Sequence, residues 1–275
     1  MNVDLKTNVH ESFVTVDGLR IRVLEQGDGP AVLLLHGASL GSSADVYRRN
    51  LGPLAAAGFR AIAFDMPGFG RSDVPNDHSL AYRRSVVPKV MDALKLKQAA
   101  LVGHSQAGAV AVELALADPG RYSHVVALGT GSLLPPLPGA EARPERAAPE
   151  AEPSLAETRA ALEATLYHRE LATPEEVELR HRSSIGRNFT AGVARAAARE
   201  PKSAGAPLWQ RLTELKMPLR MIYGRQDRAN AAARAMLLKE KFPTLDLHLI
   251  EGCHHLVPWD AADEFVRLTA AFLKR

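Results

Sequence analysis

A single stretch of this chain decides the fold: residues 101–108, which read Leu-Val-Gly-His-Ser-Gln-Ala-Gly. An apolar run leads into a turn of small residues, and the segment that follows the turn is again apolar. Residues 98–102 are predicted to form a buried strand, and residues 107–117 a helix that packs on a sheet. The stretch therefore predicts a sharp strand-to-helix turn with Ser105 at its corner.

A serine at such a corner is lifted above the edge of the sheet, and the next backbone N–H points at the substrate oxygen. The residues two before and two after the serine must be small, because a larger side chain would collide with the neighbouring strand and helix. Gly103 meets this demand, and Ala107 stands where the Gly-x-Ser-x-Gly pattern has its second glycine. We interpret the turn as a nucleophile elbow; the alternative is a tight turn whose serine has no chemical role.

The segments before the elbow predict a parallel sheet. Residues 31–35 and 60–64 are uninterrupted apolar runs, as in strands that are buried on both faces. A predicted helix over 44–57 lies between them, and the strand–helix–strand order implies parallel pairing. Upstream, residues 13–16 and 20–25 alternate around an Asp-Gly turn and predict an antiparallel hairpin.

The same alternation continues on both sides of a long interruption. Its further predicted members are a helix over 80–94, strands over 122–128, 219–223 and 245–250, and helices over 231–241 and 261–274. These segments predict an α/β fold with a mostly parallel sheet flanked by helices.

The interruption begins with a proline-rich passage. Residues 135–153 contain six prolines, too many for regular structure. Helical patterns follow over 155–167, 174–185 and 191–198. We therefore expect a core formed by residues 1–134 and 208–275, with a helical cap, or lid, inserted over residues 135–207.

The amino-acid composition limits the kinds of molecule that this protein is expected to bind. The chain has 34 basic and 31 acidic residues, so its net charge of +3 offers no concentrated field for nucleic acid or a membrane surface. A small-molecule substrate is the expected partner, and a homo-oligomer is compatible with the sequence. The one cysteine, Cys253, excludes an intrachain disulfide and argues against a zinc site, so we expect no metal. Residues 1–13 have no apolar signal core, and no apolar run reaches the ~18 residues of a membrane helix, so we expect a cytoplasmic protein.

A serine hydroxyl needs a base within hydrogen-bond reach and a third group that orients the base. Asp227 follows the predicted strand over 219–223, and His255 follows the last predicted strand. Both therefore project from the same sheet edge as Ser105, and the order Ser, Asp, His is that of α/β-hydrolases. His254 competes with His255 for the role of base. Cys253 could also be a nucleophile, but a lone cysteine at the end of a strand is more often a small buried apolar side chain.

Acyl chemistry also needs donors for the developing oxyanion. The N–H of Gln106 directly follows the nucleophile, and the N–H of Ala38 lies in the loop after a neighbouring strand. We expect these two groups to form the oxyanion hole and His36 to brace the turn.

Several segments carry a resemblance to one family. They are residues 50–54, 57–60, 65–73, 91–94 and 259–265, together with 166–180 in the predicted cap. They resemble the meta-cleavage product hydrolases, α/β-hydrolases that break carbon–carbon bonds in the degradation of aromatic rings. Residues 252–255 are similar to the Gly-Cys-Gly-His ending that is common in α/β-hydrolases, with His254 in the place of its last glycine, and this favours His255 as the base.

The resemblance implies a cofactor-free serine hydrolase that cleaves a carbon–carbon bond in a ring-fission-type vinylogous diketone acid. Arg180 matches the cap arginine that binds the substrate's carboxylate in that family; the alternative is an exposed helix arginine. Three positions depart from the family: the loop 36–41 lacks the glycine-rich pattern, His104 replaces an asparagine, and Leu256 replaces a tryptophan. A carboxylesterase or lactonase with the same triad therefore remains an alternative, and so does a non-catalytic ligand-binding protein on the same fold.

Overall fold

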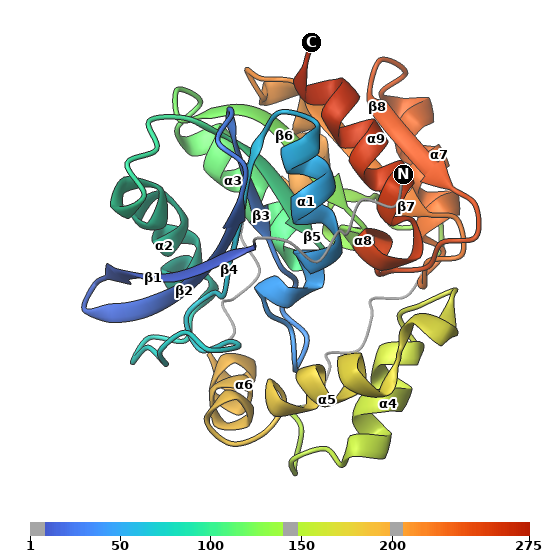
Figure 1. Ribbon diagram of the computed structural model, residues 1–275. Helices are drawn as coiled ribbons and strands as arrows, with labels where there is room; N and C mark the ends of the chain where they lie inside the picture. The colour runs from blue at the N-terminus through green and yellow to red at the C-terminus, as the bar shows by residue number, and fades with distance from the viewer. Residues whose placement is uncertain (1–8, 140–147, 199–205) are drawn as a thin grey trace, which may run out of the picture.

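The computed structural model describes residues 9–139, 148–198 and 206–275, and these contain an eight-stranded sheet in the order β1-β2-β4-β3-β5-β6-β7-β8 (Figure 1). The strands are β1 (His10–Val16), β2 (Leu19–Gln26), β3 (Ala31–Leu35), β4 (Arg60–Phe64), β5 (Ala99–His104), β6 (Tyr122–Leu128), β7 (Leu219–Gly224) and β8 (Asp246–Ile250). β2 pairs antiparallel with β1 and with β4, and every other pairing is parallel. The predicted mostly parallel sheet is confirmed.

The central strands are buried on both faces, as their uninterrupted apolar runs predict. All six residues of β5 are buried, and Leu34 of β3 lies opposite Val102 of β5. The hairpin between β1 and β2 turns at Asp17 and Gly18, both of which have positive φ angles. This turn is the one that the Asp-Gly pair predicts.

Helices cover both faces of the sheet (Figure 1). They are α1 (Arg48–Ala56), α2 (Leu80–Ala93), α3 (Gln106–Ala117), α7 (Ala231–Lys241), α8 (Val257–Asp260) and α9 (Ala262–Leu273). Buried residues of α2, α3 and α7 share one apolar cluster with the sheet, and those of α1 and α9 share a second cluster with its other face. The site therefore stands on a rigid three-layer frame.

Short 3-10 helices connect these elements: η1 (Ala44–Tyr47), η2 (Gly131–Leu133), η3 (Arg169–Leu171), η4 (Leu208–Gln210) and η5 (Leu212–Glu214). The helix predicted over 44–57 is thus divided into η1 and α1, with Ser43 accepting a hydrogen bond from the N–H of Asp45 at the start of η1.

Between β6 and β7 the chain forms α4 (Leu155–Glu163), α5 (Pro174–Arg182) and α6 (Arg187–Ala197). We call residues 148–198 the helical insertion; it lies at one end of the sheet in Figure 1. Two of its helices begin at side-chain caps, since Ser154 forms a capping box with Glu157 before α4, and Thr173 caps α5. Residues 140–147 of the proline-rich passage and residues 1–8 lie outside the described residues.

The helical insertion is attached to the loop after β4. Asn188 Nδ2 donates to the carbonyl of Gly70 over 3.0 Å, and Arg195 Nη1 donates to the carbonyl of Gly68 over 2.7 Å. The Arg195 guanidinium also lies 3.7 Å from the centre of the Phe69 ring. The carboxyl end of the sheet thus faces the helical insertion.

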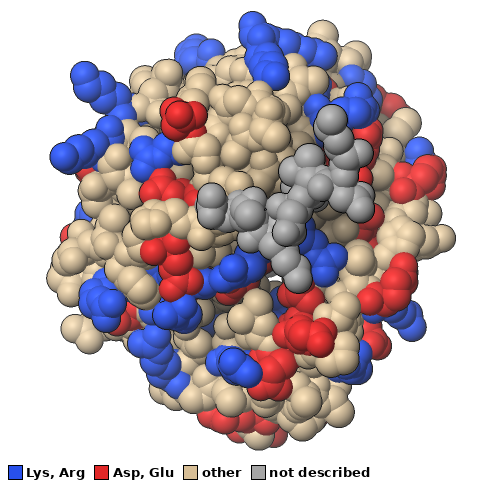
Figure 2. Space-filling view, in the orientation of Figure 1, with Lys and Arg blue, Asp and Glu red and all other residues tan. Residues whose placement is uncertain are grey.

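The surface carries mixed charge. Figure 2 shows Lys and Arg intermixed with Asp and Glu over the face in view. In the ranges that the structure describes, no helix has the length and apolar character needed to span a bilayer. The same ranges hold no group of three His, Cys, Asp or Glu side chains arranged for a metal ion.

Candidate active site

The structure brings three side chains together at the carboxyl end of the sheet. Ser105 directly follows β5, Asp227 lies in the loop after β7, and His255 lies in the loop after β8. His255 Nε2 is 3.2 Å from Ser105 Oγ, and its Nδ1 is 3.1 Å from each carboxylate oxygen of Asp227. Asp227 and His255 are both buried. This chain of hydrogen bonds is the arrangement that activates a serine hydroxyl.

The backbone holds Ser105 in a strained conformation. Its φ is 57° and its ψ is −123°, a region that residues with a Cβ rarely occupy. A Cβ on Gly103 would lie 2.3 Å from the Ala107 carbonyl oxygen, and one on Gly108 would lie 1.9 Å from Thr130 Oγ1. The small residue at 103 was predicted, but the closer approach at Gly108 was missed, because only the fold brings Thr130 there.

The neighbouring residues His254 and Cys253 do not reach Ser105. The backbone N–H of His254 donates to Asp260, and its Nδ1 is buried without a hydrogen-bond partner among the described residues. Cys253 is fully buried, and burial raises the pKa of its thiol. Cys253 therefore has the character of a small buried hydrophobe.

The two predicted oxyanion donors belong to segments next to the serine, since a Cβ on Gly37 would lie 3.3 Å from Ser105 Cβ and Gln106 directly follows Ser105. Ala38 follows Gly37 in the loop after β3, and Gln106 is the first residue of α3. In the described part of the chain, neither N–H has an acceptor of its own. His36 braces this loop: its Nε2 accepts from the N–H of Met66, and its Nδ1 lies 2.7 Å from the carbonyl oxygen of Gly37. Burial lowers the pKa of His36 to about 4, so the ring is neutral at pH 7.

His104, the residue before the serine, contacts the histidine of the site. Its Nε2 lies 2.9 Å from the backbone carbonyl oxygen of His255, so Nε2 carries the proton that it donates. The two imidazole centroids are 4.9 Å apart. Burial lowers the pKa of His104 to about 3, with a smaller contribution from His255. His104 is therefore a neutral side chain that holds the backbone of His255.

Arg180 of α5 contacts the loop after β3, and it lines a small hollow beside Gly41 and Trp259 rather than the cavity that contains Ser105. Its Nη2 donates to Ser39 Oγ and to the Leu40 carbonyl, both over 3.2 Å, so the guanidinium lies against the loop that carries Ala38. Burial lowers the pKa of Arg180 to about 10, and within the described ranges no carboxylate forms an ion pair with it. A partly buried guanidinium without an acidic partner is suited to bind an anion.

A buried cluster of charged side chains holds η1, which follows the loop after β3. The Arg22 guanidinium donates to both carboxylate oxygens of Asp45 over 2.9 Å and lies 3.3 Å from Asp65. Asp65 accepts from the N–H of Ala44 over 2.6 Å and from that of Arg71 over 2.8 Å, while burial raises the pKa of its carboxyl. Sequence reasoning missed this cluster because its members are far apart in the chain.

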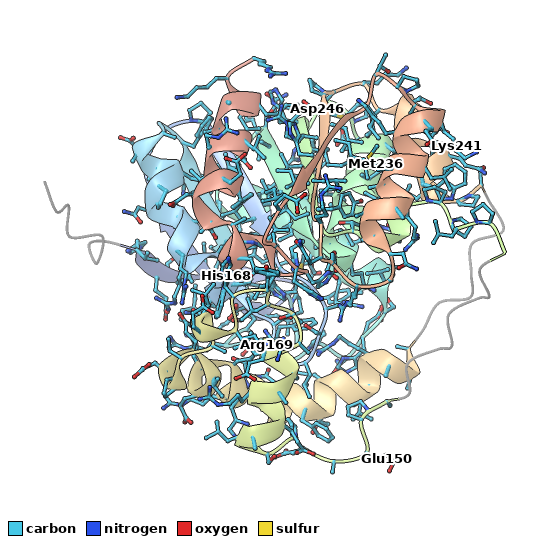
Figure 3. All side chains as sticks on the ribbon, turned by 90° about the vertical axis from the view of Figure 1, so that its right-hand side faces the viewer. Glu150, His168, Arg169, Met236, Lys241 and Asp246 are labelled. Atoms are coloured by element: carbon cyan, nitrogen blue, oxygen red, sulfur yellow. The ribbon has the colours of Figure 1, made fainter. Side chains whose placement is uncertain are left out.

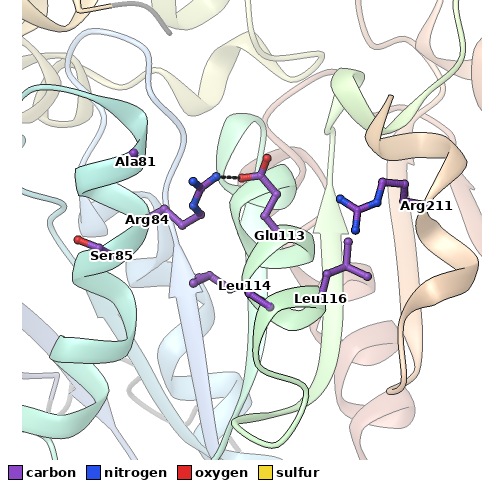
Figure 4. A pocket seen from close by; sticks show the side chains of 8 residues that line it. Ala81, Arg84, Ser85, Glu113, Leu114, Leu116 and Arg211 are labelled. Carbon is purple, nitrogen blue, oxygen red and sulfur yellow. Dashed lines mark hydrogen bonds and ion pairs between the residues drawn. The ribbon is translucent and has the colours of Figure 1, made fainter. Parts of the chain in front are cut away.

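Two hollows differ in their relation to the serine. A cavity of about 350 Å³ adjoins Ser105 and His255, and its wall includes Ser132, Arg228 and Arg234. A hollow of about 520 Å³ lies between α2 and α3, lined by the Arg84–Glu113 ion pair, two leucines and Arg211 (Figure 4). Only the first contains side chains of the Ser105, His255 and Asp227 group, so it is the candidate substrate site.

A family profile described as the alpha/beta hydrolase fold matches residues 30–262, and the chain belongs to this family. It is 34% identical to the 2-hydroxy-6-oxo-6-phenylhexa-2,4-dienoate hydrolase of Burkholderia cepacia, over 98% of both chains. It is 33% identical to the 2-hydroxy-6-oxononadienedioate/2-hydroxy-6-oxononatrienedioate hydrolase of Comamonas testosteroni, again over 98% of both. The expected resemblance to meta-cleavage product hydrolases is confirmed, and the protein is an enzyme of the hydrolase class.

Solved structures agree on the fold. The 2-hydroxy-6-oxo-6-phenylhexa-2,4-dienoate hydrolase of Rhodococcus sp. strain RHA1 superposes with a TM-score of 0.78 at 23% identity, covering 98% of this chain and 99% of that one. The meta-cleavage product hydrolase of Pseudomonas fluorescens IP01 gives 0.76 at 24% identity, covering 96% and 97%. At these identities the likeness concerns the fold alone.

Proposed function

We propose that this protein is a serine hydrolase that cleaves a carbon–carbon bond in a ring-fission-type vinylogous diketone acid, with Ser105, His255 and Asp227 as its catalytic triad. The observation that carries the proposal is the chain of hydrogen bonds from Asp227 through His255 to Ser105 at the carboxyl end of the sheet. The names of the relatives support the substrate class, since both act on 2-hydroxy-6-oxo dienoic acids.

The proposed reaction has two stages. The dienol substrate first becomes the keto tautomer: its enol oxygen loses a proton and a proton is added at carbon, with His255 carrying the proton. Ser105, or a water molecule, then attacks the C6 carbonyl while His255 accepts the nucleophile's proton and Asp227 holds the imidazole. The carbon–carbon bond breaks and the carbon leaving group takes up a proton. When Ser105 attacks, water then releases the acyl group.

Negative charge develops on the carbonyl oxygen during the attack. The N–H groups of Ala38 and Gln106 have no acceptor within the described ranges, so they are the two donors that we assign to the oxyanion hole. The His36 contacts with Gly37 and Met66 fix the loop that presents Ala38.

We assign Arg180 to the carboxylate of the dienoate. Its guanidinium contacts Ser39 and Leu40 in the same loop as Ala38, so we place the bound carboxylate beside that loop. The fork of N–H donors on arginine fits a carboxylate. Because Arg180 belongs to α5, the helical insertion takes part in substrate binding. We propose that residues 135–207 act as a cap on a core formed by 1–134 and 208–275.

The test compares two substrates in three proteins: wild type, Arg180→Gln and the control Arg182→Gln. Arg182 lies on the same helix, but its side chain is 72% exposed and pairs with Glu178. With 2-hydroxy-6-oxo-6-phenylhexa-2,4-dienoate, kcat/KM should fall about 10²-fold or more in Arg180→Gln only, because a buried charge pair is lost. With p-nitrophenyl acetate, which has no carboxylate, the three proteins should agree within about twofold.

Equal losses of Arg180→Gln on both substrates would assign the arginine a structural role. No turnover of the dienoate beside rapid turnover of the ester would support the second candidate, a carboxylesterase or lactonase. The departures at His104, at Leu256 and in the loop 36–41 favour that candidate. In either case Ser105→Ala should be inactive.

A further inference from the structure

The loop that carries His255 is attached to the helical insertion immediately after the histidine. The N–H of Leu256 donates to the carbonyl of Thr165 over 3.0 Å. The side chains of Leu256 and Trp259 are buried in an apolar cluster whose other buried members all come from the insertion: Leu162, Leu166, Ala172 and Val177. The residue after the proposed base is thus part of the hydrophobic core of the insertion.

A second attachment precedes the histidine. The carboxylate of Asp260, at the end of α8, accepts the N–H of His254 over 2.8 Å. The same carboxylate accepts the N–H of Tyr167 at 2.9 and 3.1 Å and that of His168 at 3.0 Å. In Figure 3, His168 lies at the junction between the core and the insertion. One carboxylate thus joins two consecutive amides of the insertion to the amide beside the base.

The carboxylate of Asp260 accepts hydrogen bonds from backbone N–H groups and, among the described residues, does not pair with a cation. No Lys or Arg side chain in the described parts of the chain pairs with its carboxylate. An ionised carboxylate accepts about four hydrogen bonds, and bonds from N–H to a charged acceptor are stronger than neutral ones. All the hydrogen bonds that Asp260 accepts here therefore serve to fix the segment 167–168 and the loop of His255 in one arrangement.

We propose that Asp260 is a positioning residue that couples the helical insertion to the catalytic base. The inference rests on the proposed role of His255. Because Asp260 holds the residue before His255 and Thr165 holds the residue after it, a displacement of the segment 165–168 displaces the imidazole relative to Ser105. The insertion therefore orients the base in addition to binding substrate through Arg180.

The experiment uses the full chain with Asp260→Ala, Asp260→Asn and the control Asp263→Asn. Asp263 is an exposed residue of α9. Since a displacement of about 1 Å in a catalytic group costs roughly 10²-fold, kcat should fall about 10²-fold in Asp260→Ala on both the dienoate and p-nitrophenyl acetate. Asp260→Asn keeps one acceptor oxygen, so its loss should be about 10-fold. KM for the dienoate should change less than about twofold because Arg180 is untouched.

Hydrogen exchange supplies a readout that a loss of overall stability does not produce. At a temperature where circular dichroism shows each protein folded, the amides of Tyr167, His168 and His254 should lose protection together in both Asp260 variants, and β5 should not change. An unaltered kcat, or faster exchange at 167–168 with His254 unchanged, would overturn the coupling. A different result would contradict the proposed function itself, namely full activity of the His255→Ala variant.

Discussion

The buried histidines His104 and His36 should make the folded protein less stable in mild acid. The substitution His104→Asn removes the contribution of His104 to this loss of stability. Burial lowers the pKa of His104 from 6.5 to about 3 in the folded protein. Between these values the unfolded chain binds a proton that the folded chain does not. The contribution to stability is therefore complete above about pH 6.5 and is lost progressively as the pH falls toward the folded value.

The magnitude follows from that shift. One pKa unit corresponds to 1.36 kcal/mol, so going from pH 7 to pH 5 costs about 2 kcal/mol for one such histidine. His36, whose pKa is lowered to about 4, adds about the same amount. The carboxylates contribute little in this window, since a group such as Asp45, with a pKa near 2, stays ionised throughout.

The measurement is urea unfolding at pH 7 and pH 5, followed by tryptophan fluorescence, for wild type, His104→Asn and His168→Asn. His168 has a side chain that is 44% exposed, so its replacement should change the pH dependence far less than that of the buried His104. The free energy of unfolding should fall between the two pH values by about 2 kcal/mol less in His104→Asn than in wild type. Equal losses in the two proteins would refute the assignment of His104 as a neutral buried base, whatever the stability of the variant at pH 7.

Three further substitutions test the site and its support. His255→Ala should reduce kcat by about 10³-fold or more, whereas His254→Ala should retain most activity; the reverse result in a steady-state ester assay would make His254 the base. Gly108→Ala places a methyl group against Thr130, so it should lower thermal stability by about 1–3 kcal/mol, and adding Thr130→Ala should restore part of the loss; an unchanged melting temperature would contradict the steric argument. Arg22→Met leaves the buried Asp65 carboxylate without its cation and leaves Asp45 paired with Arg48 alone, so unfolding in urea should show a loss of about 3–5 kcal/mol, and a loss below about 1 kcal/mol would show that the cluster is hydrated.

The strands and the order of the candidate catalytic residues could be predicted from the sequence because both depend on local patterns. β4 and β6 have the predicted bounds, since each is an apolar run between turn signals. Ser105, Asp227 and His255 could be proposed because each follows a predicted strand. The helix boundaries were less accurate: α4 ends at Glu163 rather than 167, and α6 begins at Arg187, directly after Gly186 with its positive φ.

The features that the sequence did not predict are contacts between residues distant in the chain. Arg22 meets Asp65 across 43 positions, and the amides of Tyr167 and His168 meet Asp260 across more than 90. No periodicity encodes such pairs, because they depend on how β2 and β4 pair and on where the helical insertion packs. In the sequence, Asp260 is notable only as part of the segment 259–265, which resembles the family.

The position of the helical insertion between β6 and β7 has a consequence for how this architecture can diversify. These strands are parallel neighbours in the sheet, so the connection leaves at the carboxyl end of β6 and must return to β7 at its amino end, where Leu219 pairs with Val125. A parallel pair needs a crossover connection of about a dozen residues or more, so a segment of very different length can form this connection without changing the register of the sheet. Replacing the insertion still has a requirement, however. The new segment must provide an acceptor for the N–H of Leu256 and backbone N–H groups for the carboxylate of Asp260. We expect chimeras that transfer the insertion together with residues 252–260 to fold and turn over substrate, and chimeras that transfer the insertion alone to fold without activity.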